Sequence, residues 1–256
     1  MKDSISTSMT GAVTRMIGKQ VYFAVYYLTG IRLAADTYYA DWGQISAIFL
    51  APIEKIAPLL PSKKLQLIEH SPGKTGVYIA GNNFRKIRSL PPYNEFVVAV
   101  PVTYNGPGAA EDITHYYFLT LPVSKEAARW GGAHLMGMPK FVAPITYEEG
   151  ERAICCTVCM GGQDFMSLEM ERLETSFQTL ERAYYGFREG KYIRTRVHVE
   201  GMIGTREGPP GARFRLGTHP MADRFIALEI EKVSTSSFYM SRGSSVLYKP
   251  DLILPA

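Results

Sequence analysis

The feature that most constrains the fold is a series of short apolar stretches separated by turn-forming residues. Four of these stretches occupy residues 42–50, 76–80, 93–104 and 115–121. Such stretches, rich in Val, Ile, Tyr and Phe, are typical of β-strands, and Gly, Pro and Asn between them are typical of turns. The 23 glycines, 16 prolines and 16 tyrosines of the 256-residue chain also favour strands and turns over long helices. The sequence therefore predicts the α+β class, with one mostly antiparallel sheet, open or closed as a barrel, and a few helices.

The remaining segments are assigned from the same signals. Short helices are predicted over residues 52–61, where prolines stand at both ends, and over residues 125–130, which Ser124 would cap and two glycines would end. Residues 164–179 carry apolar side chains at helical spacing. Strands are predicted on both sides of a turn at residues 148–150 and over residues 192–199, 225–230 and 245–254.

The chain is long enough to bury a large core. Residues 1–41 are predicted to form an N-terminal extension packed on the core, and residues 42–256 to form the main domain. No stretch reaches the ~18–20 consecutive apolar residues that a membrane-spanning helix needs. The N-terminus carries the acidic Asp3 and leads into no apolar signal region, so the cytoplasm is the expected location.

Charge and cysteine content narrow the possible partners. The formal net charge of +4, from 28 basic and 24 acidic residues, suits an anionic small molecule and is too weak to argue for nucleic acid. All three cysteines lie within residues 155–159, and no second Cys or Cys/His pair completes a zinc site at suitable spacing. This segment is predicted to be a half-buried strand, and no metal is expected.

Lys140 is a single amine within ten residues, 135–144, that otherwise carry no charge. An ordinary lysine titrates near ~10.4, and removal of water disfavours the charged ammonium form by up to several units. A lysine in such an environment is a candidate for imine (Schiff-base) chemistry on a carbonyl substrate. The alternative is a lysine whose stem packs on apolar surface while its amine reaches water.

Glu95 is similarly isolated, as the one acid of the predicted strand at residues 93–104. A buried carboxylate must find a partner or take up a proton, so Glu95 is a candidate active-site acid, base or orienting group. The alternative places it on the solvent face at the start of the strand.

Taken in order, four segments resemble the acetoacetate decarboxylase family. They are IAPLLPSKKL (residues 56–65), YNEF with the following strand (93–106), AARWGGAHLMGMPK (127–140) and LGTHPMAD (216–223). The third is the most specific, because it is similar to the signature that carries the imine-forming lysine. The resemblance covers roughly residues 42–255.

The resemblance implies a cone-like antiparallel β-barrel, a homo-oligomer and a small keto acid substrate. It places Lys140 on the nucleophilic lysine of the family and Glu95 on its active-site glutamate. We expect Met136, Met138, Phe141 and His134, which surround the lysine in the sequence, to contact the substrate.

Three departures from the family pattern stand near these positions. Phe141 replaces a second lysine, and Trp42 or a neighbour stands where the family has an active-site arginine. The segment before the lysine signature reads Gly-Ala-His at residues 132–134 in place of Gly-Arg-Glu. With no neighbouring cation expected, desolvation is the expected activator of Lys140.

The leading hypothesis is an enzyme, a carbon–carbon lyase that decarboxylates acetoacetate or a similar β-keto acid through an imine on Lys140 and needs no cofactor. A first alternative is a pyruvate-type aldolase and dehydratase that uses the same lysine. A second alternative is a non-catalytic barrel that binds a small ligand.

Overall fold

The computed structural model describes residues 36–88, 90–105 and 113–256. These residues belong to one compact unit, Asp36–Ala256. Its first strand begins at Thr37, so residues 37–41 belong to the sheet and not to an extension that precedes it. Residues 1–35 of the predicted N-terminal extension lie outside the described residues.

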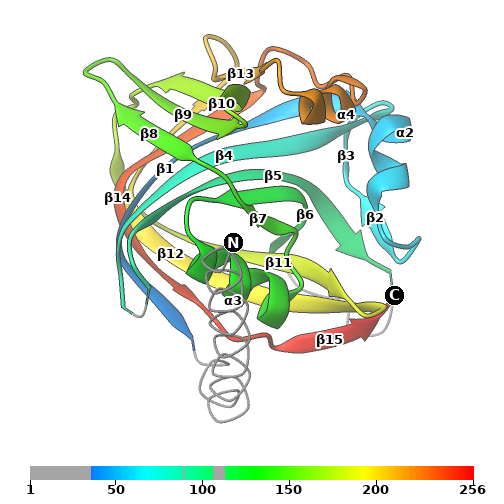
Figure 1. Ribbon diagram of the computed structural model, residues 1–256. Helices are drawn as coiled ribbons and strands as arrows, with labels where there is room; N and C mark the ends of the chain where they lie inside the picture. The colour runs from blue at the N-terminus through cyan, green and yellow to red at the C-terminus, as the bar shows by residue number, and fades with distance from the viewer. Residues whose placement is uncertain (1–35, 89, 106–112) are drawn as a thin grey trace, which may run out of the picture. The chain divides into compact units, whose positions relative to one another are not determined.

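Seven long strands form a closed barrel (Figure 1). In order around the barrel they are β5 (Tyr93–Tyr104), β4 (Lys74–Ile87), β1 (Thr37–Pro52), β14 (Ser236–Leu247), β12 (Lys191–Glu207), β11 (Ser176–Arg188) and β6 (Thr114–Val123). Pairing of β5 with β6 closes the ring. All neighbours are antiparallel except β6 and β11, which run parallel. The predicted antiparallel barrel is therefore confirmed.

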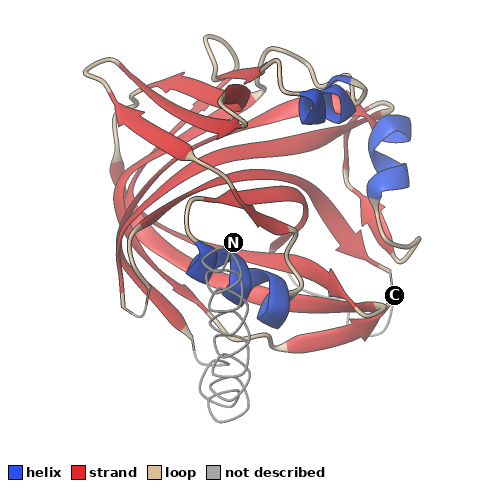
Figure 2. Ribbon diagram, viewed as in Figure 1, coloured by secondary structure: helices blue, strands red, loops and turns tan. Residues whose placement is uncertain are grey.

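Shorter elements cover the barrel. Four short strands pair with strands of the barrel: β2 (Leu65–Leu67) with β5, β3 (Glu69–Ser71) with β4, β7 (Lys140–Val142) with β6, and β15 (Leu252–Pro255) with β12. A second sheet contains β13 (Arg213–Leu216), β10 (Gln163–Glu171), β9 (Ala153–Met160) and β8 (Ile145–Glu149). The helical segments are α2 (Ile53–Ile56), η1 (Ala57–Leu59), α3 (Glu126–Met136), η2 (Pro220–Ala222) and α4 (Asp223–Ile226). Figure 2 shows how little of the fold is helical.

Successive side chains of β4 point alternately into two different cores. Val77 and Ile79 face outward and pack with the second sheet, whereas Tyr78 and Phe84 face the barrel interior. Side chains on successive residues of a strand point to opposite faces, so a barrel wall that is covered on both sides is apolar on both. The chain consequently has an outer core between the sheets and an inner core that surrounds the barrel axis.

The cysteines belong to β9, as predicted. Cys156 is fully buried in the outer core, and burial raises the pKa of its thiol. Cys156 packs closely on β4, because a Cβ added to Gly81 of β4 would lie 2.4 Å from the Cβ of Cys156. Within the described ranges, no group of three His, Cys, Asp or Glu side chains could hold a metal ion.

Two predicted elements are wrong. Residues 164–179 do not form a helix. They contain most of β10, the connection that follows it, and the start of β11. Met166, Leu168 and Met170 are buried at a period of two, a strand pattern that the neighbouring Phe165 obscures because it is also buried. Residues 225–230 contain the end of α4 instead of a strand. Phe225 and Leu228, three positions apart, are buried on one side of this helical turn.

The predicted strand over residues 245–254 is interrupted. β14 ends at Leu247 and β15 begins at Leu252. Pro250 lies in the break and has no N–H to donate to a neighbouring strand.

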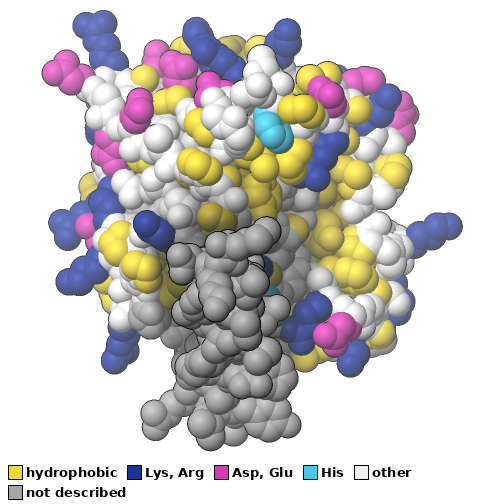
Figure 3. Space-filling view, in the orientation of Figure 1, with side chains coloured by type: hydrophobic (Ala, Val, Ile, Leu, Met, Phe, Trp, Pro, Cys, Tyr) yellow, Lys and Arg dark blue, Asp and Glu magenta, His cyan; other side chains and the backbone are white. Residues whose placement is uncertain are grey.

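The outer surface carries charges of both signs. Figure 3 shows Lys and Arg side chains interspersed with Asp and Glu around one face of the molecule, with hydrophobic side chains between them. In the part of the chain that the structure describes, no helix is long and apolar enough to cross a membrane.

Candidate active site

A cavity of about 70 Å³ lies inside the barrel. At roughly 10–15 Å³ for each water position, it has room for about five water molecules or a small organic ligand. Most of its lining is aromatic or aliphatic. Its other lining side chains are Gln44, Asn82, Glu95, Lys140, Arg182 and Ser245. A mostly apolar cavity with a few convergent polar groups is the usual form of a ligand site.

Lys140 reaches the cavity from the turn that follows α3. The helix runs through both glycines that were predicted to end it and stops at Gly137, whose φ of 64° is left-handed. Ser124 does not cap the helix; its Oγ accepts a hydrogen bond from the Asn94 N–H instead. The turn is held against β11, where the Phe187 N–H donates to the Gly137 carbonyl at 2.8 Å. Lys140 then begins β7 beside Leu121 of β6.

The stem of Lys140 passes over α3 where that helix has no side chain. A Cβ added to Gly132 would lie 2.5 Å from both Cδ and Cε of Lys140, too close for any real contact. The path brings the amine inward, and the side chain of Lys140 is only 7% exposed. The alternative in which the amine reaches water is therefore wrong.

The amine of Lys140 meets Glu95 inside the barrel. Lys140 Nζ donates to Glu95 Oε2 at 2.6 Å, and the Glu95 side chain is 10% exposed. The amine also lies 5.8 Å from the ring centre of Tyr93. Glu95 is therefore not on a solvent face. The sequence predicted desolvation as the activator of Lys140; in the structure the amine also has an acid, Glu95, as its direct partner.

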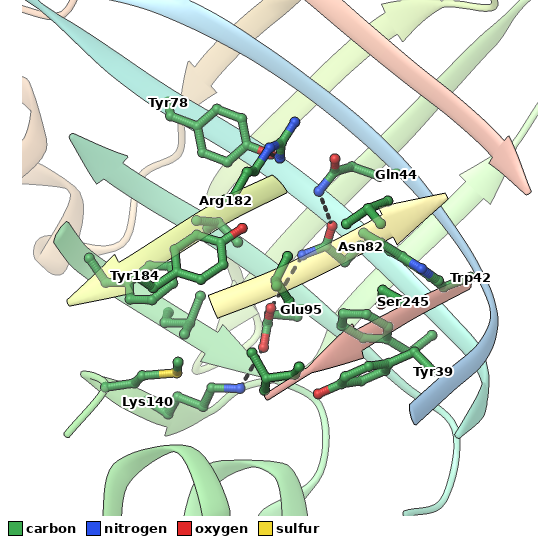
Figure 4. A pocket seen from close by; sticks show the side chains of 18 residues that line it. Tyr39, Trp42, Gln44, Tyr78, Asn82, Glu95, Lys140, Arg182, Tyr184 and Ser245 are labelled. Atoms are coloured by element: carbon green, nitrogen blue, oxygen red, sulfur yellow. Dashed lines mark hydrogen bonds and ion pairs between the residues drawn. The ribbon is translucent and has the colours of Figure 1, made fainter. Parts of the chain in front are cut away.

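A chain of amides orients Glu95 from its other side (Figure 4). Asn82 Nδ2 donates to Glu95 Oε1 at 3.2 Å, and Gln44 Nε2 donates to Asn82 Oδ1 at 2.6 Å. The three residues come from adjacent strands β1, β4 and β5, where Gln44 is paired with Asn82 and Asn82 with Glu95. The carboxylate thus has one oxygen on the amine and one on an amide, which fixes its plane.

Two buried phenols lie near the amine. Tyr39 and Tyr93 hydroxyl oxygens are 3.5 Å apart. Burial, with a further contribution from the negative charge of Glu95, raises the pKa of Tyr39. Burial also raises the pKa of Tyr93, to which Tyr39 and Glu95 add. Both phenols are therefore neutral at physiological pH and can donate hydrogen bonds.

A second cation, Arg182 of β11, lines the same cavity. Its Nη1 donates to the Tyr78 hydroxyl at 2.9 Å, and its guanidinium lies 5.4 Å from the Tyr78 ring centre and 5.2 Å from that of Phe238. Burial opposes the charged form, but the phenols of Tyr78, Tyr184 and Tyr116 outweigh it and raise the pKa of Arg182. No carboxylate of the described residues forms an ion pair with it.

Comparison with known protein families identifies the family of the chain. The family model described as Acetoacetate decarboxylase (ADC) matches residues 28–248. The chain belongs to the acetoacetate decarboxylase family. The match confirms the family that the four sequence segments resemble. No curated protein sequence matches the chain significantly.

Solved structures of the acetoacetate decarboxylase family share the fold. The acetoacetate decarboxylase of Legionella pneumophila has a TM-score of 0.65 at 14% identity, over 86% of this chain and 87% of that chain. The enduracididine biosynthesis enzyme MppR, in complex with the condensation product of pyruvate and imidazole 4-carboxaldehyde, has a TM-score of 0.63 at 14% identity. That likeness covers 86% of this chain and 89% of MppR. At this identity the likeness concerns the fold alone.

The structure separates the side chains that the sequence groups around Lys140. Met138 lines the cavity, but Met136, Phe141 and His134 do not. Met136 is buried among side chains of the inner core but does not reach the cavity, and Phe141 packs against the outer core. His134 is exposed on α3, with its ring stacked on Trp130 and its Nδ1 at 3.1 Å from the Trp130 carbonyl. Neighbours in sequence diverge here because a helix end and a strand start point them to different sides.

The sequence lacks the family's active-site arginine near residue 42, but the cavity has a cation from elsewhere in the fold. Trp42 itself lines the cavity, and Arg182 supplies the positive charge from β11. Sequence reasoning missed Arg182 because Glu181 before it suggests a solvated face. It missed Asn82 because Gly81-Asn82-Asn83 has the composition of a turn, although the strand continues through it.

Proposed function

We propose that this protein is a Schiff-base-forming carbon–carbon lyase that acts on a small keto acid through Lys140. The observation that carries this proposal is the contact between Lys140 Nζ and Glu95 Oε2 inside a small, mostly apolar cavity. A buried amine with an adjacent acid–base group is the arrangement that imine chemistry uses. Membership of the acetoacetate decarboxylase family supports the same reaction class.

Imine formation begins when Glu95 accepts a proton from the Lys140 ammonium. The free amine attacks the ketone carbon, and a C–N bond forms while one proton passes from the amine nitrogen to the carbonyl oxygen. Glu95 then returns its proton to the leaving hydroxyl, and water departs to give a protonated imine. Because the carboxylate lies 2.6 Å from Nζ, both proton transfers fall within hydrogen-bond reach.

Decarboxylation of a β-keto acid follows from the positive imine. The C–C bond to the carboxylate breaks, carbon dioxide leaves, and the electron pair moves through the adjacent carbon to the imine nitrogen to give an enamine. Protonation of the enamine carbon and hydrolysis of the imine release a ketone and restore Lys140. Neutral Tyr39 and Tyr93 line or border this end of the cavity as further hydrogen-bond donors.

A second candidate function uses the same lysine. The enamine of pyruvate or a related keto acid would attack an aldehyde, and loss of water would give a conjugated product. Two observations favour it: Phe141 replaces the second lysine of decarboxylases, and the structurally similar MppR is known in complex with a pyruvate condensation product. Release of carbon dioxide from a β-keto acid, against formation of a conjugated absorbance with pyruvate plus an aldehyde, separates the two.

The test of the proposal is borohydride trapping. Wild-type protein incubated with a keto acid and reduced should gain a permanent mass on Lys140, located by peptide mass spectrometry. Lys140→Arg should abolish the adduct, and Lys125→Arg, an exposed lysine just before α3, should not. An adduct that persists in Lys140→Arg would mean that the nucleophile is another amine, and a wild-type protein that no keto acid labels would favour a non-catalytic ligand-binding barrel.

The family also leads us to expect a homo-oligomer in the cytoplasm. Light scattering after size-exclusion chromatography would give the number of subunits.

A further inference from the structure

Arg182 is a partly buried charge that the reaction steps at Lys140 leave unused. An arginine presents five N–H donors, and the phenol of Tyr78 accepts one of them in the structure. Aromatic rings and neutral phenols stabilise a cation but do not neutralise it. Because a buried charge without a counter-charge is costly, such a group usually has an anionic partner.

The charges in the cavity do not cancel. Lys140 and Glu95 neutralise each other at 2.6 Å, so the positive charge of Arg182 remains in excess among the lining residues. The excess charge would be balanced by an anionic group of a ligand. A guanidinium is suited to a carboxylate, which it can bind through two parallel hydrogen bonds.

Arg182 and Lys140 lie at different ends of the cavity. Figure 4 shows the guanidinium beside Tyr78 and the amine beyond Glu95, with Glu95 and Asn82 between them. On β4, Tyr78 contacts Arg182, whereas Asn82, four residues further along, contacts Glu95, the partner of Lys140. In a β-keto acid one carbon separates the ketone from the carboxylate. A substrate whose ketone reaches Lys140 would approach Arg182 better with a carboxylate farther along its chain.

Two buried hydroxyl groups lie on the barrel strands β1 and β12. Among the residues that the structure describes, Ser46 Oγ and Thr195 Oγ1 are buried and have no hydrogen-bond partner. Ser46 is paired in register with Ala80, which lies between Tyr78 and Asn82, and Thr195 is paired with Tyr184. Buried polar atoms without partners are rare in native proteins. Neither hydroxyl lines the cavity, so they place polar groups near the Tyr78 and Tyr184 positions by strand register alone.

We propose that Arg182 binds a second, distal carboxylate of the substrate, so that the substrate class is a keto dicarboxylic acid and not acetoacetate. This inference rests on the proposed imine chemistry at Lys140. Binding at the distal group leaves the reacting carboxylate without a cation to hold it. A cation there would stabilise the ground state that decarboxylation must leave, and so would slow the reaction.

The experiment compares two substrates that differ only at the distal carbon, 3-oxohexanedioate and 3-oxohexanoate. Wild-type protein should prefer the diacid by roughly 100-fold in kcat/KM, the value of a charge-assisted hydrogen-bonded pair. In Arg182→Met this preference should fall to within about threefold, and in Arg182→Lys, which keeps the charge but loses the planar fork, it should be intermediate. The ratio of the two substrates cancels any general loss of folded protein.

Binding of inert analogues separates this inference from the proposed function. Calorimetry with 3-hydroxyhexanedioate and 3-hydroxyhexanoate needs no imine, and the diacid should bind the wild type at least tenfold more tightly than it binds Arg182→Met. Trapping on Lys140 without preference for the diacid would overturn the inference and leave the proposed function intact. Preferential binding of the diacid without trapping would overturn the proposed imine chemistry and leave the assignment of Arg182 to a distal carboxylate intact. Equal binding of both analogues by the wild type would also overturn the inference.

Discussion

Gly132 lies directly against the stem of Lys140, because a methyl group on Gly132 would lie 2.5 Å from two carbons of that stem. Gly132→Ala should therefore push the stem aside and move the amine away from Glu95. Displacement of a reacting group by about 1 Å can cost ~100-fold in rate, so we expect borohydride trapping to slow by at least that factor. The rate of adduct formation on Lys140 is the measurement.

Gly131→Ala is the matched control. Gly131 precedes Gly132 in α3, and a Cβ added to it would have no atom within 4 Å. Alanine is favoured over glycine in a helix by roughly 1 kcal/mol, so this variant should be as stable as the wild type or more so. Equal trapping rates for the two variants would contradict the assigned path of the lysine stem.

Parts of the fold follow from local sequence signals. Strands bounded by clear turns, such as residues 93–104, were predicted to the residue, because turn chemistry and apolar content agree there. Residues 164–179 were not, because β10 is buried on both faces at Phe165 and Met166, and a strand of that kind has no distinct period. The closure of the barrel rests on pairing between distant strands, which no local signal contains.

The candidate site was predictable in part. Lys140 and Glu95 are lone charges in apolar segments, and the family resemblance selects both, but only the fold shows that they touch. Arg182 and Asn82 come to the cavity through strand register, since each alternates with outward-facing neighbours. The positions of Phe141 and His134 could not be read from their closeness to Lys140 in sequence, because the chain changes direction at Gly137.

Removal of the acid should affect both stability and rate. Glu95→Gln would leave Lys140 as a buried cation without a counter-charge, a change that typically costs about 3–5 kcal/mol. Loss of the proton carrier should also lower kcat by roughly 10²–10⁴-fold. Urea denaturation and steady-state kinetics measure the two effects.

Glu126→Gln offers a comparison at the surface. Glu126 pairs with Arg129 on α3, where its side chain is 61% exposed. Its loss should cost less than about 1 kcal/mol and leave the rate unchanged. A stability loss at Glu95 no larger than that at Glu126 would show that the buried pair is not formed in solution.

Alkaline pH should destabilise the protein through its buried tyrosines. Burial raises the pKa of Tyr117 to about 12, and it raises the pKa of Tyr39, Tyr93 and Tyr184 well above the ordinary value near 10. Above pH 10 the unfolded chain loses phenolic protons that the folded protein retains, so the free energy of unfolding falls as pH rises. The stabilising contribution is fully present below pH 10 and is lost progressively through pH 12 and above.

Absorbance at 295 nm and circular dichroism can follow this transition together. We expect one group of tyrosines to ionise with the fold intact and a second group to ionise only as the circular dichroism signal is lost. If all 16 tyrosines ionise in a single step near pH 10 while the fold persists, the inner phenols are not buried as described.

Asn82 is expected to act through Glu95 and not on substrate directly. Asn82→Ala removes the amide that donates to Glu95 Oε1 at 3.2 Å and that accepts from Gln44. The carboxylate would then rotate more freely, and kcat should fall by about 10-fold or more, because orientation of a catalytic group is lost. Asn83→Ala, the next residue on β4 with its side chain on the opposite face, should have little effect.

A double-mutant cycle decides the role of Asn82. In the Glu95→Gln background the Asn82→Ala substitution should add almost nothing to the loss of kcat, because residues in one hydrogen-bonded network are coupled. Full additivity of the two substitutions would mean that Asn82 supports the barrel wall independently of the carboxylate.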